Sequence, residues 1–326
     1  MKKIIILGSN SYLGASFVRY MQDKNYNLYL ISRSKILPKR FLPFKIKNKN
    51  IKFYKLDINK DLNKIITFIK NKKPAFIINY ASQSMVGQSW EEPGDWLMTN
   101  SVNTVKLYLE ISKLKLKTKL IHISTPEIYG HTKKIIKENR EYAPSTPYAL
   151  SRVNADLTLD MLKKNFGLES VSLRASNIYG EYQKNYRVVS GAVLKFLTNK
   201  KFFIDGDGSS KRSFLHVDDL SSATFLLMKK FKSGNIYHVS TNDFISIKNL
   251  AKLISKLTNK KFEANVKFRK DRVGKDKSYF LDSKKIRKLG WRPKVSLEEG
   301  IKRVILWAAS FKKKFKNEDF IYQHKK

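Results

Sequence analysis

Short apolar runs alternate with amphipathic segments through the first half of the chain. Ile4 to Leu7 form a continuous apolar run, and the segments Leu28 to Ile31 and Ala75 to Ala81 repeat this pattern. Continuous apolar runs are typical of strands that are covered on both faces, as in a parallel sheet. The segments between these runs carry apolar residues at helical spacing, so the alternation predicts βαβ units with right-handed crossovers.

The remaining elements of this half continue the same order. Asp61 is expected to cap a helix through its side chain, and a long helix is expected from Trp96 to Leu116. Strands are predicted at 52–57, 120–124 and 170–174, and a further helix is predicted at 148–165, before Gly167. The fold class predicted from this order is α/β, with a Rossmann-type doubly wound parallel sheet over residues 1–175.

The pattern becomes less regular after residue 175. Helices are expected to begin at Asp218 and after the capping residues Ser246 and Ser296, and a strand is expected at 236–239. We therefore predict a smaller mixed α/β C-terminal lobe over residues 176–326. Segments around 214–242 are expected to return to the first domain.

Composition narrows the class of protein. The chain has 326 residues, of which 42% are hydrophobic and none is cysteine, so disulfide scaffolds and cysteine-bearing metal sites are excluded. The absence of cysteine is compatible with the reducing environment of a cytoplasm, where we expect the protein to be. No apolar run is long enough for a membrane span or for the core of a signal peptide. The five histidines show no metal-ligand spacing, and no metal is expected.

The net charge of +39 is extreme, because 66 lysines and arginines face 27 acidic residues. A field of this size attracts polyanions and steers small anions. The lysines are spread along the whole chain, however, and we interpret most of them as solvated surface. No specific nucleic acid is expected as a partner. A non-catalytic module that binds NADP or a polyanion is kept as the alternative of another class.

A glycine-bearing turn connects the first predicted strand to the first helix, in the order Gly8-Ser9-Asn10-Ser11-Tyr12-Leu13-Gly14. A helix N-terminus presents free N–H groups and a positive dipole end, which together hold a pyrophosphate. Gly8 permits the tight turn and Gly14 permits close helix packing, while Ser11 replaces a third glycine. The residues of this turn predicted to contact a dinucleotide are Gly8, Ser11, Tyr12, Leu13 and Gly14.

Residues at the ends of later strands complete the predicted cofactor site. An acidic residue after the second strand would favour NAD, but this chain has Arg33, which favours the 2′-phosphate of NADP, with NAD possible. Ligands collect at the carboxyl ends of strands in open parallel sheets. Asn100 is interpreted either as a satisfied core amide or as a side chain that fixes the chain near the nicotinamide. The further cofactor candidates are Asp57, Ile58, Ala81, Ser82 and Asn100.

Four residues form a candidate apparatus for removing a proton from an alcohol. Thr125 and Glu127 follow the strand at 120–124, and Tyr148 heads the next helix. A tyrosine has a pKa of about 10 and is a poor base at neutral pH. Arg152 lies one helical turn further on, where its charge favours the phenolate. Lysine is usual in such sites, and arginine keeps the charge but presents a wider planar fork. Tyr148 and Arg152 are also expected to contact the cofactor.

Together these motifs resemble the extended short-chain dehydrogenases/reductases of the nucleotide-sugar branch, which includes epimerases, decarboxylases and 4,6-dehydratases. The resemblance covers nearly the whole chain and implies a nucleotide-diphosphate sugar as substrate. It also implies a homodimer through a four-helix bundle built from the helices around 97–115 and 148–165. The residues that carry the resemblance are 8–14, 57–58, 81–84, 99–100, 124–130, 148–152, 174–180 and 212–219.

The subclass depends on the segment Thr125-Pro126-Glu127. Within the family, a glutamate at this place points to 4,6-dehydration, so we expect Tyr148 to take the C4-hydroxyl proton and Glu127 the C5 proton. Pro126 departs from the dehydratase pattern and removes a possible acid, which leaves epimerisation, decarboxylation or simple C4 oxidation as alternatives. A diphosphate suits the arginine fork, and the candidate substrate-binding residues are Ser84, Asn177, Arg187 and Arg212.

Overall fold

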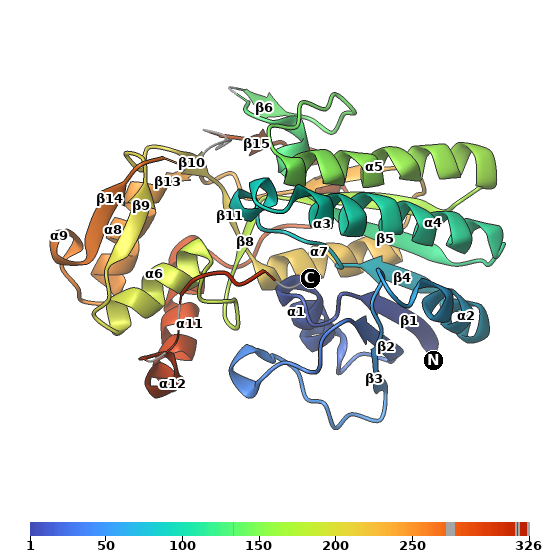
Figure 1. Ribbon diagram of the computed structural model, residues 1–326, viewed down its shortest axis with the longest axis horizontal. Coiled ribbons are helices and arrows are strands. Elements are labelled where there is room, and N and C mark those ends of the chain that lie inside the picture. Colours follow the sequence, from blue (N-terminus) through green and yellow to red (C-terminus); the bar gives the residue numbers. More distant parts are fainter. Residues whose placement is uncertain (133, 272–277, 317, 319, 325–326) are drawn as a thin grey trace.

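A seven-stranded parallel sheet lies at the centre of the larger lobe (Figure 1). The computed structural model describes residues 1–132, 134–271, 278–316, 318 and 320–324. The strand order is β12-β7-β5-β4-β1-β2-β3, and every neighbouring pair is parallel. The strands are β1 (Lys2–Leu7), β2 (Tyr26–Ser32), β3 (Ile51–Lys55), β4 (Phe76–Asn79), β5 (Lys119–Ser124), β7 (Ser170–Ala175) and β12 (Ile236–Val239). This confirms the predicted α/β fold class.

Helices cover both faces of the sheet, and alternate residues of each strand explain why. Ile4 and Ile6 of β1 pack with helices on one face, and Ile5 and Leu7 pack with helices on the other, because successive side chains of a strand point in opposite directions. The first face carries α1 (Tyr12–Met21), α7 (Val217–Lys229) and α10 (Lys284–Lys288). The second face carries α2 (Leu62–Lys72), α4 (Thr104–Lys113) and α5 (Pro147–Phe166). Figure 1 shows the sheet between α5 and α4 above and α1 and α7 below.

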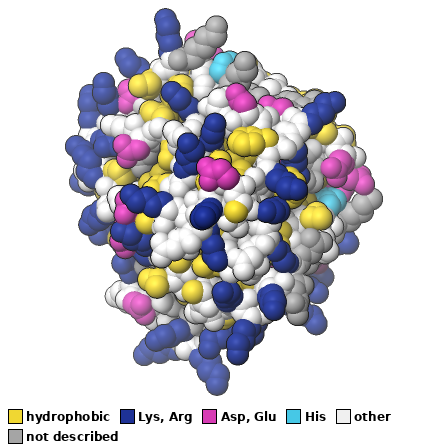
Figure 2. Space-filling view, turned by 90° about the vertical axis from the view of Figure 1, so that its left-hand side faces the viewer, with side chains coloured by type: hydrophobic (Ala, Val, Ile, Leu, Met, Phe, Trp, Pro, Cys, Tyr) yellow, Lys and Arg dark blue, Asp and Glu magenta, His cyan; other side chains and the backbone are white. Residues whose placement is uncertain are grey.

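A second lobe lies at the left of Figure 1 and has a separate apolar core. Its helices are α6 (Val188–Leu197), α8 (Ile247–Leu257), α9 (Phe262–Asn265), α11 (Leu297–Ser310) and α12 (Lys312–Lys316). The parallel strands β9 (Phe202–Asp205) and β14 (Val266–Arg269) pair beside them. Figure 2 shows this side of the molecule, where lysine and arginine side chains are scattered among uncharged ones.

Short strand pairs and single helical turns complete the described structure. The pairs are β8 (Asn177–Tyr179) with β11 (Phe214–His216), β10 (Lys211–Arg212) with β13 (Ile245–Ser246), and β6 (Ile135–Ile136) with β15 (Phe280–Leu281). The 3-10 turns are η1 (Lys39–Phe41), η2 (Gly87–Trp90) and η4 (Pro126–Tyr129). Within the described part of the chain, no helix is both long and apolar enough to cross a membrane.

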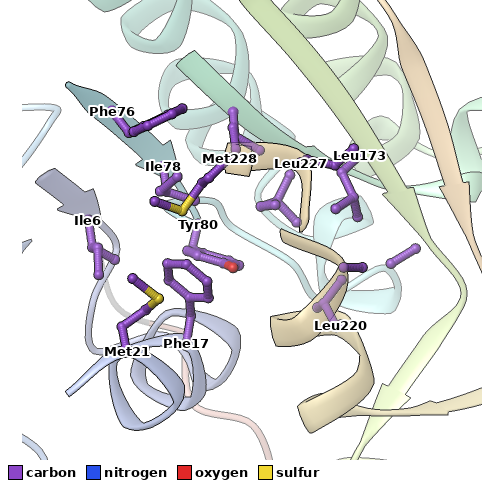
Figure 3. Packing of buried hydrophobic residues seen from close by; sticks show 14 of the residues in the cluster. Ile6, Phe17, Met21, Phe76, Ile78, Tyr80, Leu173, Leu220, Leu227 and Met228 are labelled. Carbon is purple, nitrogen blue, oxygen red and sulfur yellow. The ribbon is translucent and has the colours of Figure 1, made fainter. Parts of the chain in front are cut away.

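The core between the sheet and α1 and α7 is densely filled (Figure 3). Ile6, Phe17 and Met21 have no exposed surface, and Leu220 and Leu227 of α7 close the other side. Burial of one such side chain contributes about 1.5–3 kcal/mol. This packing fixes α1 against β1 and therefore fixes the turn between them, where the predicted dinucleotide site begins.

Three predicted elements differ from the structure. The helix expected from Trp96 to Leu116 is α3 (Pro93–Leu97), a π-helical segment η3 (Met98–Asn103) and then α4, which ends at Lys113. Asp61 occupies the N-cap of α2, but its carboxylate accepts no backbone amide of the first helical turn. It accepts hydrogen bonds from the Asp57 amide and from the Lys64 side chain instead. Helix α7 begins at Val217, and the ring of His216 caps it by accepting from the Asp218 amide.

Candidate active site

The turn between β1 and α1 tolerates no side chain at either glycine. Gly8 has φ +71°, and a Cβ atom there would lie 2.5 Å from the Ala81 nitrogen. A Cβ atom at Gly14 would lie 2.4 Å from the Gly8 oxygen. The Ser11 hydroxyl accepts from the Gly14 amide at 3.1 Å and so caps α1. The tight turn and close packing predicted for the glycines are both present, and the N-terminus of α1 faces the point where the strand order reverses between β1 and β4.

Asn10 ties this turn to the end of β2. Its amide nitrogen donates to the Ser34 oxygen at 3.0 Å, the Ser34 hydroxyl at 3.1 Å and the Lys35 oxygen at 2.8 Å. Arg33 therefore belongs to a segment that is held beside the glycine turn, where the far ribose of a dinucleotide lies in such folds. Asn10 was not anticipated from the sequence, although it lies within the motif.

The candidates after β3 and β4 have local partners. The Asp57 carboxylate accepts from the Asn59 amide at 2.8 Å, and the Ile58 side chain is buried. The Ala81 amide donates to the Asn79 side chain at 2.9 Å, which shapes the loop after β4. Both loops open at the carboxyl edge of the sheet, beside the glycine turn.

Asn100 is fully buried, and its amide group makes three hydrogen bonds to Gln83 and Ser151. Its oxygen accepts from the Gln83 amide at 2.8 Å, and its nitrogen donates to the Gln83 oxygen at 2.9 Å and to the Ser151 hydroxyl at 3.0 Å. These contacts satisfy the amide and also fix the neighbouring chain, so they agree with both interpretations. Asn100 holds the loop that carries Ala81 and Ser82 against α5.

Thr125, Glu127 and Tyr148 meet at the carboxyl end of β5. Thr125 follows β5 directly, and its hydroxyl donates to the Glu127 carboxylate. Tyr148 lies in the first turn of α5, which the Thr146 hydroxyl caps by accepting from the Ala149 amide at 3.1 Å. The Tyr148 side chain hydrogen-bonds Thr125 and is 7% exposed. A hydroxyl, a carboxylate and a phenol therefore form one connected group.

The pKa of the Tyr148 hydroxyl is raised above its ordinary value. Burial is the largest cause, and the negative charge of Glu127 adds to it. The charge of Arg152, the hydrogen bond with Thr125 and the charge of Arg187 act in the opposite direction. The predicted effect of Arg152 is therefore correct in sign, but in the free protein burial outweighs it.

Arg152 points into the protein and is 2% exposed. Its Nη2 nitrogen donates to the Ile123 carbonyl and to Nε2 of His122 at 3.2 Å, while its Nε nitrogen has no partner. Burial lowers the pKa of His122 to about 3, so the ring is neutral and can accept this bond. The other ring nitrogen lies 2.6 Å from the Tyr108 hydroxyl. His122 is fully buried on β5, and it holds the guanidinium of Arg152, which extends from α5.

Two predicted substrate-binding residues contact each other between the lobes. The Arg187 guanidinium, at the start of α6, donates to the Ser84 hydroxyl at 2.7 Å. Ser84 follows the loop after β4, so the contact spans from the large sheet to the smaller lobe. The structure thus brings both candidates to one place.

The other two substrate-binding candidates, Asn177 and Arg212, both contact Tyr279, a residue that was not predicted from the sequence. The Tyr279 hydroxyl donates to Oδ1 of Asn177 at 2.9 Å and lies 3.3 Å from Oε1 of Glu127. The guanidinium carbon of Arg212 lies 4.6 Å from the centre of the tyrosine ring. Tyr279 follows a charged segment and fits no local pattern, so only the folded chain reveals it. Among the described residues, no group of three or more histidines and carboxylates could hold a metal ion.

The parallel sheet, the glycine turn at its switch point and the Thr125–Glu127–Tyr148 group define an extended short-chain dehydrogenase/reductase. A family model described as GDP-mannose 4,6 dehydratase matches residues 5–304. The chain therefore belongs to the NAD-dependent epimerase/dehydratase family, in the part that contains the nucleotide-sugar 4,6-dehydratases.

Several known proteins with similar sequences or structures carry dehydratase names, and a UDP-glucose 4-epimerase of Thermotoga maritima is also similar in structure, with 25% identity and a TM-score of 0.86 over 94% of this chain and 99% of that one. The chain is 28% identical to a dTDP-glucose 4,6-dehydratase of Haemophilus influenzae, over 94% of this chain and 98% of the relative. It is 30% identical to a trifunctional protein of Arabidopsis thaliana with a UDP-glucose 4,6-dehydratase activity, but it spans only 47% of that relative's length. A crystal structure of dTDP-glucose 4,6-dehydratase from Bacillus anthracis in complex with NAD is 26% identical, with a TM-score of 0.85 over 96% of this chain and 98% of that one.

Proposed function

We propose that this protein is a nucleotide-sugar 4,6-dehydratase, which converts a nucleotide-diphosphate hexose to its 4-keto-6-deoxy derivative. The observation that carries the proposal is the Glu127 carboxylate, which is hydrogen-bonded to Thr125 within the group that contains Tyr148. Simple oxidation at C4 requires the phenol and the threonine alone. A carboxylate beside them supplies the base that removal of the C5 proton requires.

The residues present fit a nicotinamide dinucleotide. The glycine turn leaves the N-terminus of α1 open to a pyrophosphate, and the buried Nε nitrogen of Arg152 has no partner in the protein. We propose that Gly8, Ser11 and Gly14 hold the pyrophosphate and that Tyr148 and Arg152 face the nicotinamide ribose. When bound, this cofactor accepts a hydride from C4 of the sugar and later returns it to C6.

NADP is the proposed form of the cofactor. The proposal is supported by Arg33 at the end of β2, where a guanidinium suits a 2′-phosphate, and by the Asn10 bonds that hold this segment beside the glycine turn. NAD is the alternative, because the Bacillus anthracis relative was crystallised with NAD.

The side chains of the site divide the proton transfers among themselves. We propose that Tyr148 removes the proton of the C4 hydroxyl while Thr125 bonds the same oxygen. The resulting ketone acidifies the neighbouring C5–H bond, and Glu127 removes that proton as water leaves from C6. Arg187 and Arg212 are proposed to bind the diphosphate, with Ser84 and Asn177 beside them, since the guanidinium fork matches phosphate oxygens.

A homodimer is also proposed, through the helices around 97–115 and 148–165. Leu150, Leu157 and Met161 follow one another at helical spacing on α5 and are between 42% and 55% exposed. Met98 and Val102 are exposed on the neighbouring helical segment η3, which packs against α5. An apolar stripe of this kind across two adjacent helices suits a second pair of helices and hence a four-helix bundle.

The proposed activity is tested by incubating the protein with dTDP-glucose, UDP-glucose, GDP-mannose and UDP-glucuronic acid in the presence of NADP or NAD. Mass spectrometry of a dehydratase reaction shows loss of one water, about 18 mass units, from the sugar. An isomer of unchanged mass indicates an epimerase, and loss of carbon dioxide from a nucleotide uronic acid indicates a decarboxylase. If no sugar is changed but the dinucleotide binds, the non-catalytic module takes the place of the enzyme.

A further inference from the structure

The elimination of water from C6 requires an acid as well as a base. Hydroxide is a poor leaving group, and a positioned proton donor typically accelerates such a step by about 10²–10⁴-fold. Glu127 is the base in the proposed reaction and cannot hold a proton when it begins. Pro126, the residue between Thr125 and Glu127, has no side-chain proton to donate. The acid must therefore come from another part of the chain.

Tyr279 brings a hydroxyl group to the side of Glu127 that faces away from Thr125. Its hydroxyl lies 3.3 Å from Oε1 of Glu127, whereas the Thr125 hydroxyl bonds Oε2. The carbonyl oxygen of the Asn177 side chain accepts from the same hydroxyl at 2.9 Å and orients it. The tyrosine is 4% exposed, so its ring is held rigidly by its surroundings. The group thus stands beside the proposed base in a fixed position.

We propose that Tyr279 is the acid that protonates the C6 hydroxyl as it leaves. This role rests on the proposed dehydratase function and adds a residue to it. Tyr279 directly precedes β15 and lies more than 150 positions after Glu127 in the chain. A phenol remains protonated at neutral pH and can therefore donate. The Arg212 guanidinium, 4.6 Å from the ring centre, stabilises the negative charge that develops when the proton departs.

The proton transfers balance through this pair. Glu127 takes the proton from C5, the C6–O bond breaks, and the leaving hydroxide takes the Tyr279 proton and departs as water. The phenolate of Tyr279 then recovers a proton from the carboxylic acid of Glu127, which lies beside it. Both side chains return to their starting states, and the sugar has lost one water.

When the hydride returns to C6, one proton must still be added at C5. The reaction has already released one, because Tyr148 took the proton of the C4 hydroxyl. Thr125 hydrogen-bonds both Tyr148 and Glu127, so that proton has a path to the carboxylate beside C5. Tyr148, Thr125, Glu127 and Tyr279 therefore form one hydrogen-bonded chain from C4 to C6, and no outside oxidant or acid is required.

The test compares Tyr279→Phe with the parent protein on whichever of dTDP-glucose, UDP-glucose and GDP-mannose the parent dehydrates. We expect release of the 6-deoxy product to fall about 10²–10⁴-fold. Oxidation at C4, seen as the absorbance of the reduced nicotinamide, is expected to persist. Exchange of the C5 proton with deuterium from solvent, seen by mass spectrometry, is also expected to persist because Glu127 is intact.

Tyr237→Phe is the matched control, since Tyr237 is a buried tyrosine of β12 outside the site and its variant is expected to behave as the parent. Product release by Tyr279→Phe at the parent rate would overturn the proposal. Equal loss of C4 oxidation, C5 exchange and product would also overturn it, because Tyr279 would then act only by holding the site together. If the parent protein dehydrates none of the three sugars, the dehydratase function itself fails, and the role of Tyr279 falls with it.

Discussion

For single residues, the chemistry of this protein depends on the protonation state of each buried side chain. Burial raises the pKa of Tyr148 and lowers that of His122 to about 3. The neutral imidazole of His122 can therefore accept from Arg152 and hold that cation against β5. An arginine in place of the usual lysine is thus accommodated by a histidine on the neighbouring strand.

Glu127 and Tyr148 are expected to fail at different steps when each is replaced. Glu127→Gln should abolish the 6-deoxy product but still allow reduction of the bound cofactor, because only the C5 base is lost. Tyr148→Phe should reduce both signals by about 10²–10⁴-fold, since every proposed outcome begins with proton loss from C4. Absorbance and product mass measured on the same sample separate the two steps.

Glu141→Gln serves as the control for the carboxylate change, because Glu141 is an exposed loop carboxylate to which no role in the site is assigned. Dehydration by Glu127→Gln at the parent rate would remove the dehydratase proposal and favour an epimerase or a C4 oxidoreductase.

Arg33 is expected to set the choice between the two dinucleotides. Arg33→Asp should weaken NADP binding by about tenfold or more, since a charge-assisted contact to phosphate contributes about 1.5–3 kcal/mol. NAD binding should change much less or improve, because a carboxylate can bond the ribose hydroxyls. Calorimetric titration with each dinucleotide gives the comparison, with Arg292→Asp as an exposed control. Equal affinities of the parent protein for NADP and NAD would contradict the role of Arg33.

At the scale of elements, helix ends and helix faces position the site. The Ser11, Thr146, Ser246 and Ser296 side chains each cap a helix, which fixes where α1, α5, α8 and α11 begin. The caps of α1 and α5 place the dinucleotide turn and Tyr148 on the same edge of the sheet. The outer face of α5 has a different role, because Leu150, Leu157 and Met161 on it are about half exposed.

Helix α5 is expected to form the dimer through its exposed apolar residues. Leu157→Glu and Met161→Glu should each weaken self-association by about 10–100-fold, since burial of such a side chain contributes about 1.5–3 kcal/mol. Sedimentation measured over a range of concentrations reports the change. Leu306→Glu on α11 is the control, because Leu306 is 71% exposed but lies in the other lobe. A parent protein that is monomeric at all concentrations would contradict the prediction.

At the scale of the whole molecule, the dominant property is the charge of +39. The lysine and arginine side chains are scattered over the face of the smaller lobe in Figure 2 and form no single stripe. A field of this kind attracts anions from every direction but gives no register on a nucleic acid. The buried histidines are a second global property, because they couple folding to pH.

Binding to DNA is expected to be weak and independent of sequence. Because each phosphate contact releases counterions, affinity should fall by about 10³-fold or more between low and physiological salt. Fluorescence anisotropy with two DNA duplexes of unrelated sequence gives the measurement. Tight binding to one sequence at physiological salt would favour the polyanion-binding module over the enzyme.

The free energy of unfolding is expected to fall as the pH drops from about 6.5 toward 3. The pKa values of buried His122 and His238 are lowered to about 3, whereas a histidine of the unfolded chain titrates near 6.5. Between these values the unfolded state binds protons that the folded state does not, so the stability present above pH 6.5 is progressively lost. At pH 5 the loss is roughly 2 kcal/mol for each histidine.

Urea unfolding at pH 7 and pH 5 tests this coupling. His238→Gln should remove about half of the difference, because its ring no longer takes up a proton on unfolding. His131→Gln is the control, since His131 is exposed. Stability that is the same at pH 7 and pH 5 would contradict the assignment of neutral buried histidines.

Features with a local period or spacing could be predicted from the sequence alone. The apolar runs of β1 and β4 predicted buried parallel strands, and the spacing of Gly8 and Gly14 predicted the turn that opens α1. Four residues from Tyr148 to Arg152 make one helical turn, so their proximity followed from helix geometry alone. Such features depend on neighbours in the chain, and elementary steric rules fix them.

Contacts between distant segments could not be predicted in this way and became visible in the folded chain. No pattern in the chain predicts that Tyr279 lies beside Glu127 or that His122 bonds Arg152, because these pairs come from different elements that meet only when the sheet and the lobes pack. The π-helical segment at Met98–Asn103 was missed for the same reason, since α-helical periodicity cannot reveal one inserted turn. Packing of the whole chain sets these positions, and they decide which proton each side chain of the site can reach.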